Sequence, residues 1–273
     1  MLSVNGIKSF LPPDAQIEIE FFLQTDSTNR VAMERALARA PHGTVVLAES
    51  QTHGRGRRGK RFFSPPGGGL YISFVLYFEN LRFTNPTAIT AYAAVRVCEA
   101  IESLCGIQAG VKWVNDIFYK GKKVGGILAE GVPDSQTRGM DGQARSLDAK
   151  SHAVGAVVLG IGLNISADPG DFPEELRGKA GSLFAKGCQP FTRSALAAEL
   201  IKRVALSHAP GEAEIFEKYK AKLFMLGSTV TVSTEKENYT AKALDIDSTG
   251  RLIVEKENGE TEFLSYGEIN ILV

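Results

Sequence analysis

Two apolar runs with a polar turn between them stand out in the stretch Val111-Lys-Trp-Val-Asn-Asp-Ile-Phe-Tyr-Lys-Gly-Lys-Lys-Val-Gly-Gly-Ile-Leu-Ala-Glu130. The turn is Lys120-Gly121-Lys122, so the stretch predicts a β-hairpin. Its polar positions are Lys112, Asn115, Asp116 and Lys123. In a plain hairpin these four side chains would only form a solvated face, and the hairpin alone does not assign them a function.

Strand and helix patterns alternate around this hairpin. Strand-like runs extend over Val45 to Ala48, Leu70 to Tyr77, Val111 to Val114 and Ile127 to Ala129. One helix is expected to begin at Ser27-Thr28-Asn29, which are good capping residues, and to end near Pro41-His42-Gly43. A second helix, from about Thr87 to Leu104, carries an apolar residue every fourth position: Ile89, Ala93, Val97 and Ile101. The alternation between Ile17 and Glu130 predicts a mixed α/β domain.

The pattern becomes β-like after a predicted helix over Glu212 to Leu223. Short strand-like runs follow at Thr229 to Val232, Thr240 to Ile246, Arg251 to Val254 and Thr261 to Leu264. Turns are expected at Asp247-Ser-Thr-Gly250 and at Asn258-Gly259. A compact barrel fits this tail better than more α/β structure, so we expect an α/β domain over 1–224 and a small β domain over 225–273.

One long polar stretch interrupts the α/β pattern. Residues Gly131 to His152 contain almost no large apolar side chain. We expect a mobile insertion between two strands there, with no assigned role.

The composition narrows the class of protein. The chain has 273 residues, of which 44% are hydrophobic, and 31 basic residues balance 31 acidic ones, so no global field favours nucleic acid or an acidic membrane. Three cysteines and four histidines match no metal-ligand spacing, which favours reduced thiols and no structural metal. The sequence shows neither a signal peptide nor a membrane-spanning run, so we expect a cytoplasmic protein that contacts no membrane.

The segment Gln51-Thr-His-Gly-Arg-Gly-Arg-Arg-Gly-Lys-Arg-Phe-Phe-Ser64 joins two predicted strands. Its glycines let the backbone pass close to a ligand, and its arginines supply forked, charge-assisted donors suited to a phosphate or carboxylate. It is not a Walker A loop, because no Gly-Lys-Ser/Thr follows the spacer. A solvated basic loop or a non-specific RNA-binding tract would have the same composition.

Taken together with other motifs, this loop resembles the biotin protein ligase family over nearly the whole chain. The matching pieces are Asp26-Ser-Thr-Asn29, Gln51, Gly54-Arg-Gly-Arg-Arg-Gly59, Lys112-Trp-Val-Asn-Asp116, Lys123-Val-Gly-Gly-Ile-Leu128, Gly160-Ile-Gly-Leu-Asn164 and the small β tail. The resemblance implies a catalytic α/β domain related to class II aminoacyl-tRNA synthetases, followed by an SH3-like barrel. It also implies an ATP-dependent ligase that makes biotinyl-AMP and transfers biotin to a lysine of a biotin carboxyl carrier domain.

The resemblance assigns a role to each matching residue. It implies a biotin pocket lined by Ser27, Thr28, Asn29 and Gln51. Arg55, Gly56 and Arg57 would hold the biotin carboxylate and the nucleotide phosphate, and Lys123 would approach the carboxyl oxygen and the α-phosphate. Phe62 would stack on adenine, while ATP and its Mg²⁺ would be held by Lys112, Asn115 and Asn164, without a fixed protein metal site.

Asp116 has two interpretations in this scheme: it helps take a proton from the acceptor lysine, or it is a structural carboxylate. Catalysis itself needs no nucleophilic side chain, because Arg55, Arg57 and Lys123 act by positioning and by neutralising charge.

The chain departs from the family pattern in a few places. It has Val114 where many relatives have proline, and Phe62 where some have tryptophan. Only about 16 residues precede the first predicted strand, too few for a helix-turn-helix domain, so we expect a monofunctional enzyme that binds no specific DNA. A homodimer is compatible with the sequence. The alternatives are a lipoate or octanoate protein ligase, which shares the adenylate chemistry, and a nucleic-acid-binding protein that uses the basic loop.

Overall fold

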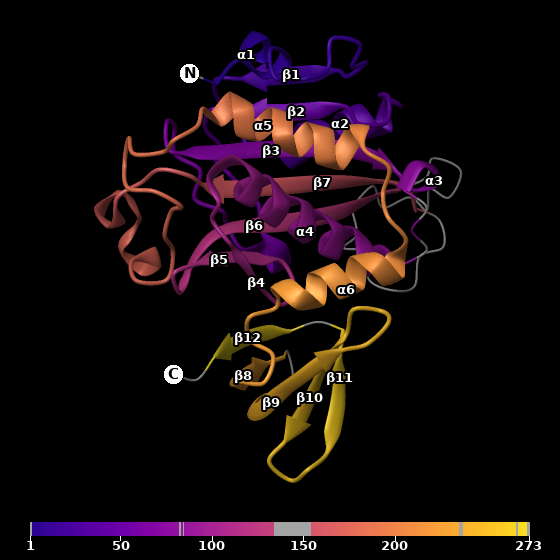
Figure 1. Cartoon of the computed structure of the whole chain (residues 1–273), viewed down its shortest axis with the longest axis vertical. Coiled ribbons are helices and arrows are strands. Elements are labelled where there is room, and N and C mark those ends of the chain that lie inside the picture. Colours follow the sequence, from indigo (N-terminus) through magenta and orange to yellow (C-terminus); the bar gives the residue numbers. More distant parts are fainter. Residues whose placement is uncertain are drawn as a thin grey trace.

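A seven-stranded sheet forms the larger part of the molecule (Figure 1), in the order β1-β2-β3-β7-β6-β5-β4. The computed structural model describes residues 2–81, 83, 85–133, 154–234, 237–265 and 267–271. The strands are β1 (Ile19–Phe22), β2 (Val45–Ala48), β3 (Gly69–Tyr77), β4 (Gly110–Lys112), β5 (Asp116–Tyr119), β6 (Lys122–Pro133) and β7 (Val154–Asn164). Only β1 and β2 pair in parallel, and the other neighbours are antiparallel. The expected mixed α/β architecture is confirmed.

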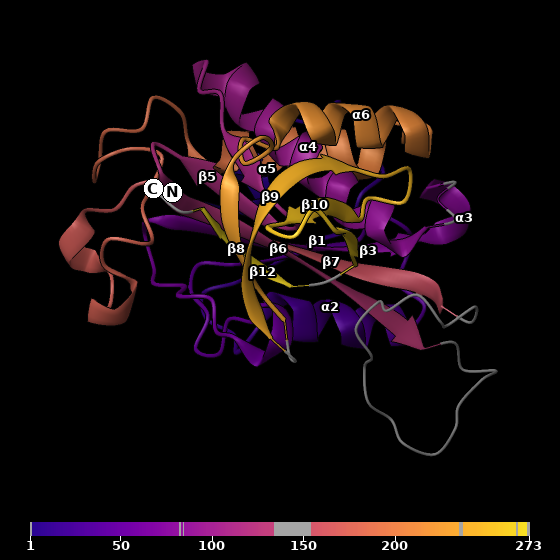
Figure 2. The ribbon, with the colours of Figure 1, turned by 90° about the horizontal axis from the view of Figure 1, so that it is seen from below.

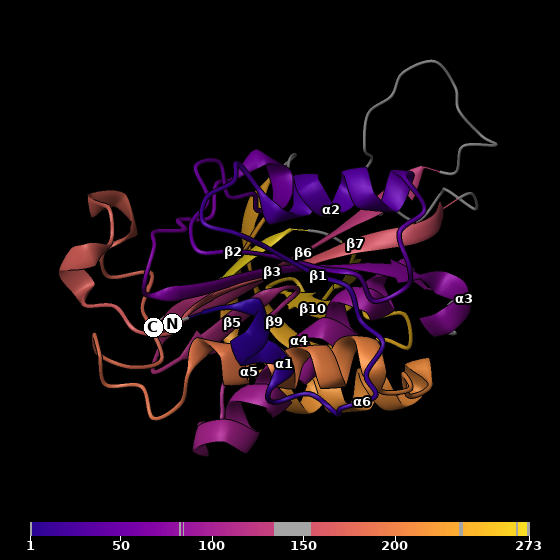
Figure 3. The same ribbon diagram turned by 90° about the horizontal axis from the view of Figure 1, so that it is seen from above.

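Helices cover both faces of this sheet (Figures 2 and 3). One face carries α2 (Thr28–Leu37), and the other carries α1 (Val4–Lys8), α4 (Pro86–Cys105), α5 (Arg193–Ile201) and α6 (Glu212–Lys222). Short elements complete the chain: α3 (Phe78–Leu81), the 3-10 turns η1 (Arg57–Gly59), η3 (Pro169–Asp171) and η4 (Glu174–Leu176), and the π-helical turn η5 (Lys202–Leu206). None of the helices in the described part of the chain is long and apolar enough to cross a membrane.

Two predicted helices correspond to α2 and α4, and three of their four ends lie close to where the sequence placed them. Ser27 is the N-cap of α2, and the Asn85 side chain caps α4 by accepting from the Thr87 N–H at 2.9 Å. The four apolar positions predicted for the second helix are all fully buried: Ile89, Ala93, Val97 and Ile101. However, α2 ends at Leu37 rather than near Pro41, because Arg39 adopts a left-handed φ of 61°.

The strand predictions need two adjustments. The turn Lys120-Gly121 has positive φ at both residues and joins β5 to β6, so the predicted hairpin is present. Strand β4 ends at Lys112, two residues before the predicted end at Val114. Strand β6 continues through Gly131–Pro133, which were assigned to the insertion, because these residues pair with β7. The remainder of the predicted insertion, 134–152, lies outside the described residues.

The C-terminal part folds into a five-stranded antiparallel sheet in the order β11-β10-β9-β8-β12. Its strands are β8 (Thr229–Ser233), β9 (Asn238–Ile246), β10 (Leu252–Lys256), β11 (Thr261–Leu264) and β12 (Glu268–Ile271). The first four correspond to the predicted runs. Strand β12 was not predicted, although it pairs with β8 and completes the sheet.

The predicted turn at Asp247–Gly250 joins the two parts of the molecule. The Trp113 Nε1–H donates to the Gly250 carbonyl at 3.1 Å. Gly250 has a φ of +80°, and a Cβ there would lie 2.6 Å from the Phe216 ring on α6. Only glycine meets both demands, so this turn fixes the small sheet against the segment that follows β4.

A buried hydroxyl on α6 supports the same segment. The Tyr219 hydroxyl donates to the Val114 carbonyl at 2.7 Å, and Tyr219 is 1% exposed. Burial raises the pKa of this phenol, so the donor stays protonated. Tyr219 thereby holds the chain between β4 and β5.

We predict that Tyr219→Phe lowers the free energy of unfolding by about 1 to 3 kcal/mol, since it leaves the buried Val114 carbonyl without its donor. Urea denaturation followed by fluorescence measures the change. The control is Tyr119→Phe, which removes a hydroxyl from a partly exposed tyrosine on β5 and should change stability by less than about 0.5 kcal/mol. Equal stability of both variants would contradict this role of Tyr219.

Candidate active site

The glycine-rich segment forms a folded hairpin-like loop rather than an open one. Backbone hydrogen bonds cross it at three levels: Gln51 N–H to Ser64 O at 3.0 Å, Phe62 N–H to Gly54 O at 2.8 Å, and Gly56 N–H to Lys60 O at 2.7 Å. At its tip, Arg58 and Gly59 both have positive φ. A Cβ on Gly54 would lie 2.4 Å from the Phe62 carbonyl, so this level of the loop requires glycine.

The base of this loop lies beside the segment that begins α2. Thr52 N–H donates to Thr25 O at 3.0 Å, and His53 N–H donates to Asp26 O at 2.9 Å. The Asp26 carboxylate accepts from the Ser27 N–H at 2.7 Å, and its pKa is held low, first by its hydrogen bond with Arg30. Two motifs that are more than twenty residues apart in the chain are therefore joined at the N-terminus of α2.

A connected series of polar side chains continues beneath the loop. The Gln51 Oε1 accepts from the Thr28 N–H at 2.8 Å and lies 3.1 Å from the Thr28 hydroxyl. The Gln51 Nε2 donates to Ser64 Oγ at 2.8 Å. On the other side of Thr28, Ser73 Oγ lies 2.8 Å from Thr28 Oγ1 and 2.6 Å from Asn29 Oδ1. Thr28, Asn29 and Ser73 are at most 4% exposed, so these bonds replace solvation that the groups have lost.

Ser27 differs from its neighbours because its side chain forms no capping hydrogen bond with α2. The residue is only 3% exposed. A buried hydroxyl is strongly favoured to find a partner. Its position at the N-terminus of α2 therefore makes it available to a bound ligand.

Three glycines leave the sheet bare between α2 and the loop. Gly126 on β6 pairs with Gly162 on β7, and Leu128 pairs with Gly160. A Cβ on Gly160 would lie 2.0 Å from the Asn29 amide oxygen, and one on Gly162 would lie 2.6 Å from the Phe62 ring. The Phe62 ring thus rests on the strand backbone, and Tyr71 meets it edge to face at 6.4 Å between ring centroids.

The hairpin motif reaches the same face of the sheet. Lys123 Nζ lies 2.6 Å from Asp116 Oδ1, and a Cβ on Gly126 would lie 3.6 Å from that ammonium group. From the loop tip, Arg57 Nη1 donates to Asn115 Oδ1 at 3.3 Å. The basic loop and the hairpin therefore meet directly through two of the predicted residues.

Lys112 lies behind this pair. Its ammonium group is 5.2 Å from the centre of the Phe118 ring. Burial lowers the pKa of Lys112, although Asp116 acts in the opposite direction. Lys112 is thus a partly desolvated cation whose charge costs free energy until an anion approaches.

Asn164 ends β7, as the sequence predicted. Its Nδ2 donates to the Gly181 carbonyl at 3.0 Å, which leaves its amide oxygen for another donor. The backbone of the segment at Gly181 also pairs with Lys123. This segment therefore joins Asn164 to the hairpin.

Arg55 lies near these groups, with its Nη1 3.2 Å from Glu130 Oε1, and Glu130 also accepts from Asn29 Nδ2. Together, these contacts bring most of the predicted site residues to one face of the sheet. The structure adds residues that the sequence reasoning missed, namely Ser64, Ser73, Tyr71 and Glu130. Ser73 had a recognisable signal, because it is a serine within the apolar run Leu70 to Tyr77. Glu130 had the same kind of signal as Asn164, a polar residue at the end of an apolar strand.

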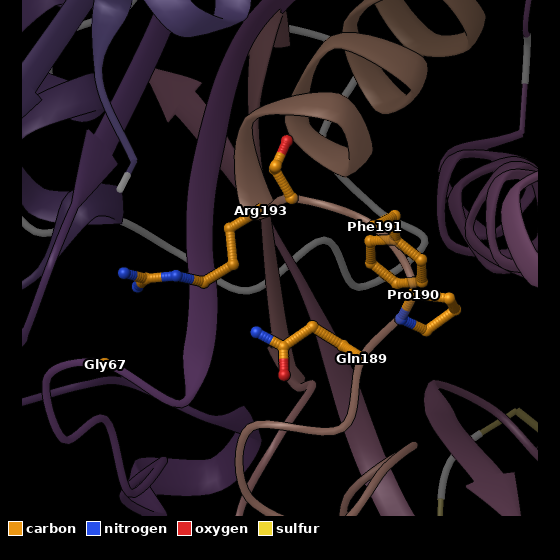
Figure 4. Close-up of a pocket in the computed structure, with 6 residues that line it drawn as sticks. Gly67, Gln189, Pro190, Phe191 and Arg193 are labelled. Carbon is orange, nitrogen blue, oxygen red and sulfur yellow. The ribbon is translucent and has the colours of Figure 1, made fainter.

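No three His, Cys, Asp or Glu side chains gather into a metal-binding group anywhere in the described ranges. A cavity of about 430 Å³ lies elsewhere, at the N-terminus of α5 (Figure 4). It is lined by Gly67, Gln189, Pro190, Phe191, Thr192 and Arg193. Arg193 is already paired with Glu49 at 2.9 Å, and none of the predicted site residues lines this cavity.

Comparisons with known proteins find similarity over both parts of the chain. The model of the Biotin/lipoate A/B protein ligase family matches residues 21–140, and that of the Biotin protein ligase C terminal domain matches residues 225–271. A bifunctional ligase/repressor BirA of Bacillus subtilis is 36% identical over 182 residues, which cover 62% of this chain and 51% of that protein. The chain thus spans about half the length of that relative.

Two further matches extend over more of the chain. A biotin--[acetyl-CoA-carboxylase] ligase of Mycobacterium tuberculosis is 27% identical over 222 residues, which cover 79% of this chain and 74% of that protein. A biotin protein ligase of Aquifex aeolicus, solved in complex with biotin and ATP, has a similar fold. Its TM-score is 0.71, with 24% identity over 93% of this chain and 98% of that one.

We predict that Lys112→Met raises the free energy of unfolding at neutral pH, because it removes a charge whose burial is unfavourable. The pKa of Lys112 is lower in the folded than in the unfolded protein, so the cost is complete below the folded pKa and fades as the pH rises toward the unfolded value. The gain from Lys112→Met should therefore shrink in alkaline buffer. Urea denaturation at neutral pH and in alkaline buffer measures the gain in the free energy of unfolding under each condition.

Lys120→Met is the matched control, since Lys120 also lies over a ring, at 5.2 Å from the Tyr119 centroid, but is exposed. It should change stability little at either pH. A loss of stability in Lys112→Met, or a gain that does not depend on pH, would contradict the assignment of Lys112 as a desolvated cation.

Proposed function

Since this chain belongs to the biotin protein ligase family, we propose that it activates biotin with ATP and transfers the biotinyl group to a lysine of a biotin carboxyl carrier domain. One observation carries the proposal. The basic loop, the start of α2 and the lysine hairpin lie together over the face of the sheet that carries Gly126, Gly160 and Gly162. These parts supply what adenylation needs: a neutral polar pocket, cations for two anionic groups, and a surface for the nucleotide.

The biotin pocket is proposed at the N-terminus of α2. The ureido ring of biotin is neutral and carries both donors and acceptors, which hydroxyls and amides match. Ser27 is 3% exposed and its side chain forms no capping bond, and the next residue, Thr28, donates to Gln51. Asn29 lies in the same hydrogen-bonded series. Glycines at 160 and 162 let Asn29 and Phe62 lie directly against the strand backbone, so both side chains sit low over the sheet.

Adenylation is proposed to proceed without a protein nucleophile. A carboxylate oxygen of biotin attacks the α-phosphorus of ATP. The new bond joins that oxygen to the phosphorus, the bond from the α-phosphorus to the bridging oxygen breaks, and pyrophosphate leaves. Both reactants are anionic, so Arg55, Arg57 and Lys123 would lower the barrier by neutralising and aligning them. Arg57 donates to Asn115 of the hairpin, and Lys123, which belongs to the hairpin, pairs with Asp116.

The nucleotide is proposed to lie over Gly126 and Gly162. Phe62 rests there and offers a ring for adenine. Lys112, Asn115 and Asn164 are the residues proposed to hold the rest of the nucleotide. We propose that Mg²⁺ enters with ATP, because this cation usually binds through substrate phosphates and one or two carboxylates. Asn115 and Asn164 each offer an amide oxygen to the nucleotide and its Mg²⁺, and no fixed protein metal site is proposed.

The second half-reaction needs a neutral acceptor amine. Its nitrogen attacks the acyl carbon of biotinyl-AMP, and AMP leaves. Asp116 is 18% exposed and paired with Lys123. We propose that Asp116 first aligns Lys123, and then accepts a proton from the acceptor amine as that amine attacks. We also propose a cytoplasmic location, because the reaction uses ATP and a carboxylase subunit.

The proposal is tested with the purified chain, ATP, Mg²⁺ and either biotin or lipoate. Biotin should give pyrophosphate release and label a biotin carboxyl carrier domain, whereas lipoate should give neither. Consumption of lipoate without consumption of biotin would move the chain to the lipoate branch of the family. Absence of both reactions, with binding of RNA instead, would favour the basic loop as a nucleic-acid site.

Lys123 and Lys122 provide a sharp internal comparison. Lys123 pairs with Asp116, whereas Lys122 donates to the Gly178 carbonyl away from the glycine face. Lys123→Ala should slow adenylate formation by roughly 10² to 10³-fold, the scale for losing one preorganised charge-stabilising group. Lys122→Ala should stay close to the unmodified protein. Pre-steady-state pyrophosphate release measures both, and equal rates would remove Lys123 from the mechanism.

A further inference from the structure

Glu130 is a carboxylate that none of the proposed steps uses, although it lies beside two residues that they do use. It follows the apolar part of β6, and its side chain is 14% exposed. Its Oε2 accepts from Asn29 Nδ2 at 2.8 Å. Its Oε1 lies 3.2 Å from Arg55 Nη1. Glu130 therefore contacts both the start of α2 and the basic loop.

Glu130 connects Arg55 to the series of hydrogen-bonded side chains beneath the loop. Starting from Arg55, the contacts pass in order through Glu130, Asn29, Ser73, Thr28, Gln51 and Ser64 to the Phe62 carbonyl. Arg55 and Phe62 lie on the two facing arms of the basic loop. These contacts thus connect both arms of the loop through side chains of α2 and the sheet.

The two partners of Glu130 have different chemical consequences. Asn29 donates its amide nitrogen to Glu130 and accepts from Ser73 with its amide oxygen, so these two residues fix the orientation of the amide. Arg55 has five N–H donors, and the described contact with Glu130 engages only Nη1. The guanidinium group can therefore stay on Glu130 and still bind an anionic ligand.

We propose that Glu130 is the positioning residue of the site: it orients Arg55 toward the anionic end of the substrate and keeps Asn29 in register with the ureido pocket. This inference rests on the proposed function. A long arginine side chain that is 47% exposed otherwise samples many rotamers. Pairing with a carboxylate that is itself fixed by Asn29 restricts the guanidinium to the side of the loop that faces the glycines.

The decisive variant is Glu130→Gln, which keeps an acceptor for Asn29 but removes the charge that holds Arg55. We expect adenylate formation at subsaturating biotin to fall by about 10- to 100-fold, the scale for small misplacement of a catalytic group. The melting temperature should change little, because the amide still fills the space. Pyrophosphate release against biotin concentration, together with thermal unfolding, gives both values.

A double-mutant cycle separates positioning from a general structural role. If Glu130 acts through Arg55, then Glu130→Gln should cause no further loss in an Arg55→Gln background. A structural defect would add to the Arg55→Gln loss instead. The matched control is Glu20→Gln, which removes an equivalent carboxylate paired with Arg35 on α2 at 2.6 Å, away from the loop. It should leave the biotin dependence unchanged.

Each outcome has a distinct meaning. Loss in Glu130→Gln that disappears in the Arg55→Gln background supports the proposal. Activity within about twofold of the unmodified protein, or losses that add in the double variant, overturns it. If the unmodified protein releases no pyrophosphate with biotin, the proposed function fails first, and that result is visible before any variant is made.

Discussion

Gln51 joins the start of α2 to the base of the basic loop, and the geometry of the candidate site depends on that link. Its amide oxygen satisfies the Thr28 backbone N–H at the helix terminus, while its amide nitrogen holds Ser64. Because Thr28 is 4% exposed, losing the Gln51 acceptor would leave the buried Thr28 N–H without its partner. The loop is therefore attached to a rigid helix rather than free to move from its base, and only the part beyond Gly54 projects over the sheet.

A second constraint is space. Gly126, Gly160 and Gly162 remove side chains from the middle of β6 and β7, so that Phe62 and Asn29 approach the strand backbone. Anything bound over this face would lie between a neutral, hydrogen-bonded wall at α2 and the cations Lys112 and Lys123 of the hairpin. This division suits a ligand with an uncharged ring at one end and an anion at the other. Biotin has this form, and we propose that the anionic end of its adenylate lies toward the hairpin.

The sequence predicted the elements with strong local signals. The Lys120-Gly121 turn, the buried face of α4 and the Asp247–Gly250 turn all depend on nearby residues, and all are present. Strand β12 was missed because Glu268–Ile271 is short and finds its place by pairing with the distant β8. The convergence of the motifs came from the family resemblance rather than from periodicity. The pairs Arg57–Asn115 and Arg55–Glu130 join residues that are far apart in the chain, and no local pattern encodes them.

We propose that the buried polar series at α2 forms the floor of a biotin pocket. A crystal structure of the protein with a non-hydrolysable analogue of biotinyl-AMP checks this placement. We expect the ureido ring within hydrogen-bonding distance of Ser27 and Gln51, with the phosphate analogue between Arg57 and Lys123. An analogue bound elsewhere, for example in the cavity beside Arg193, and not at the N-terminus of α2, would overturn the assignment.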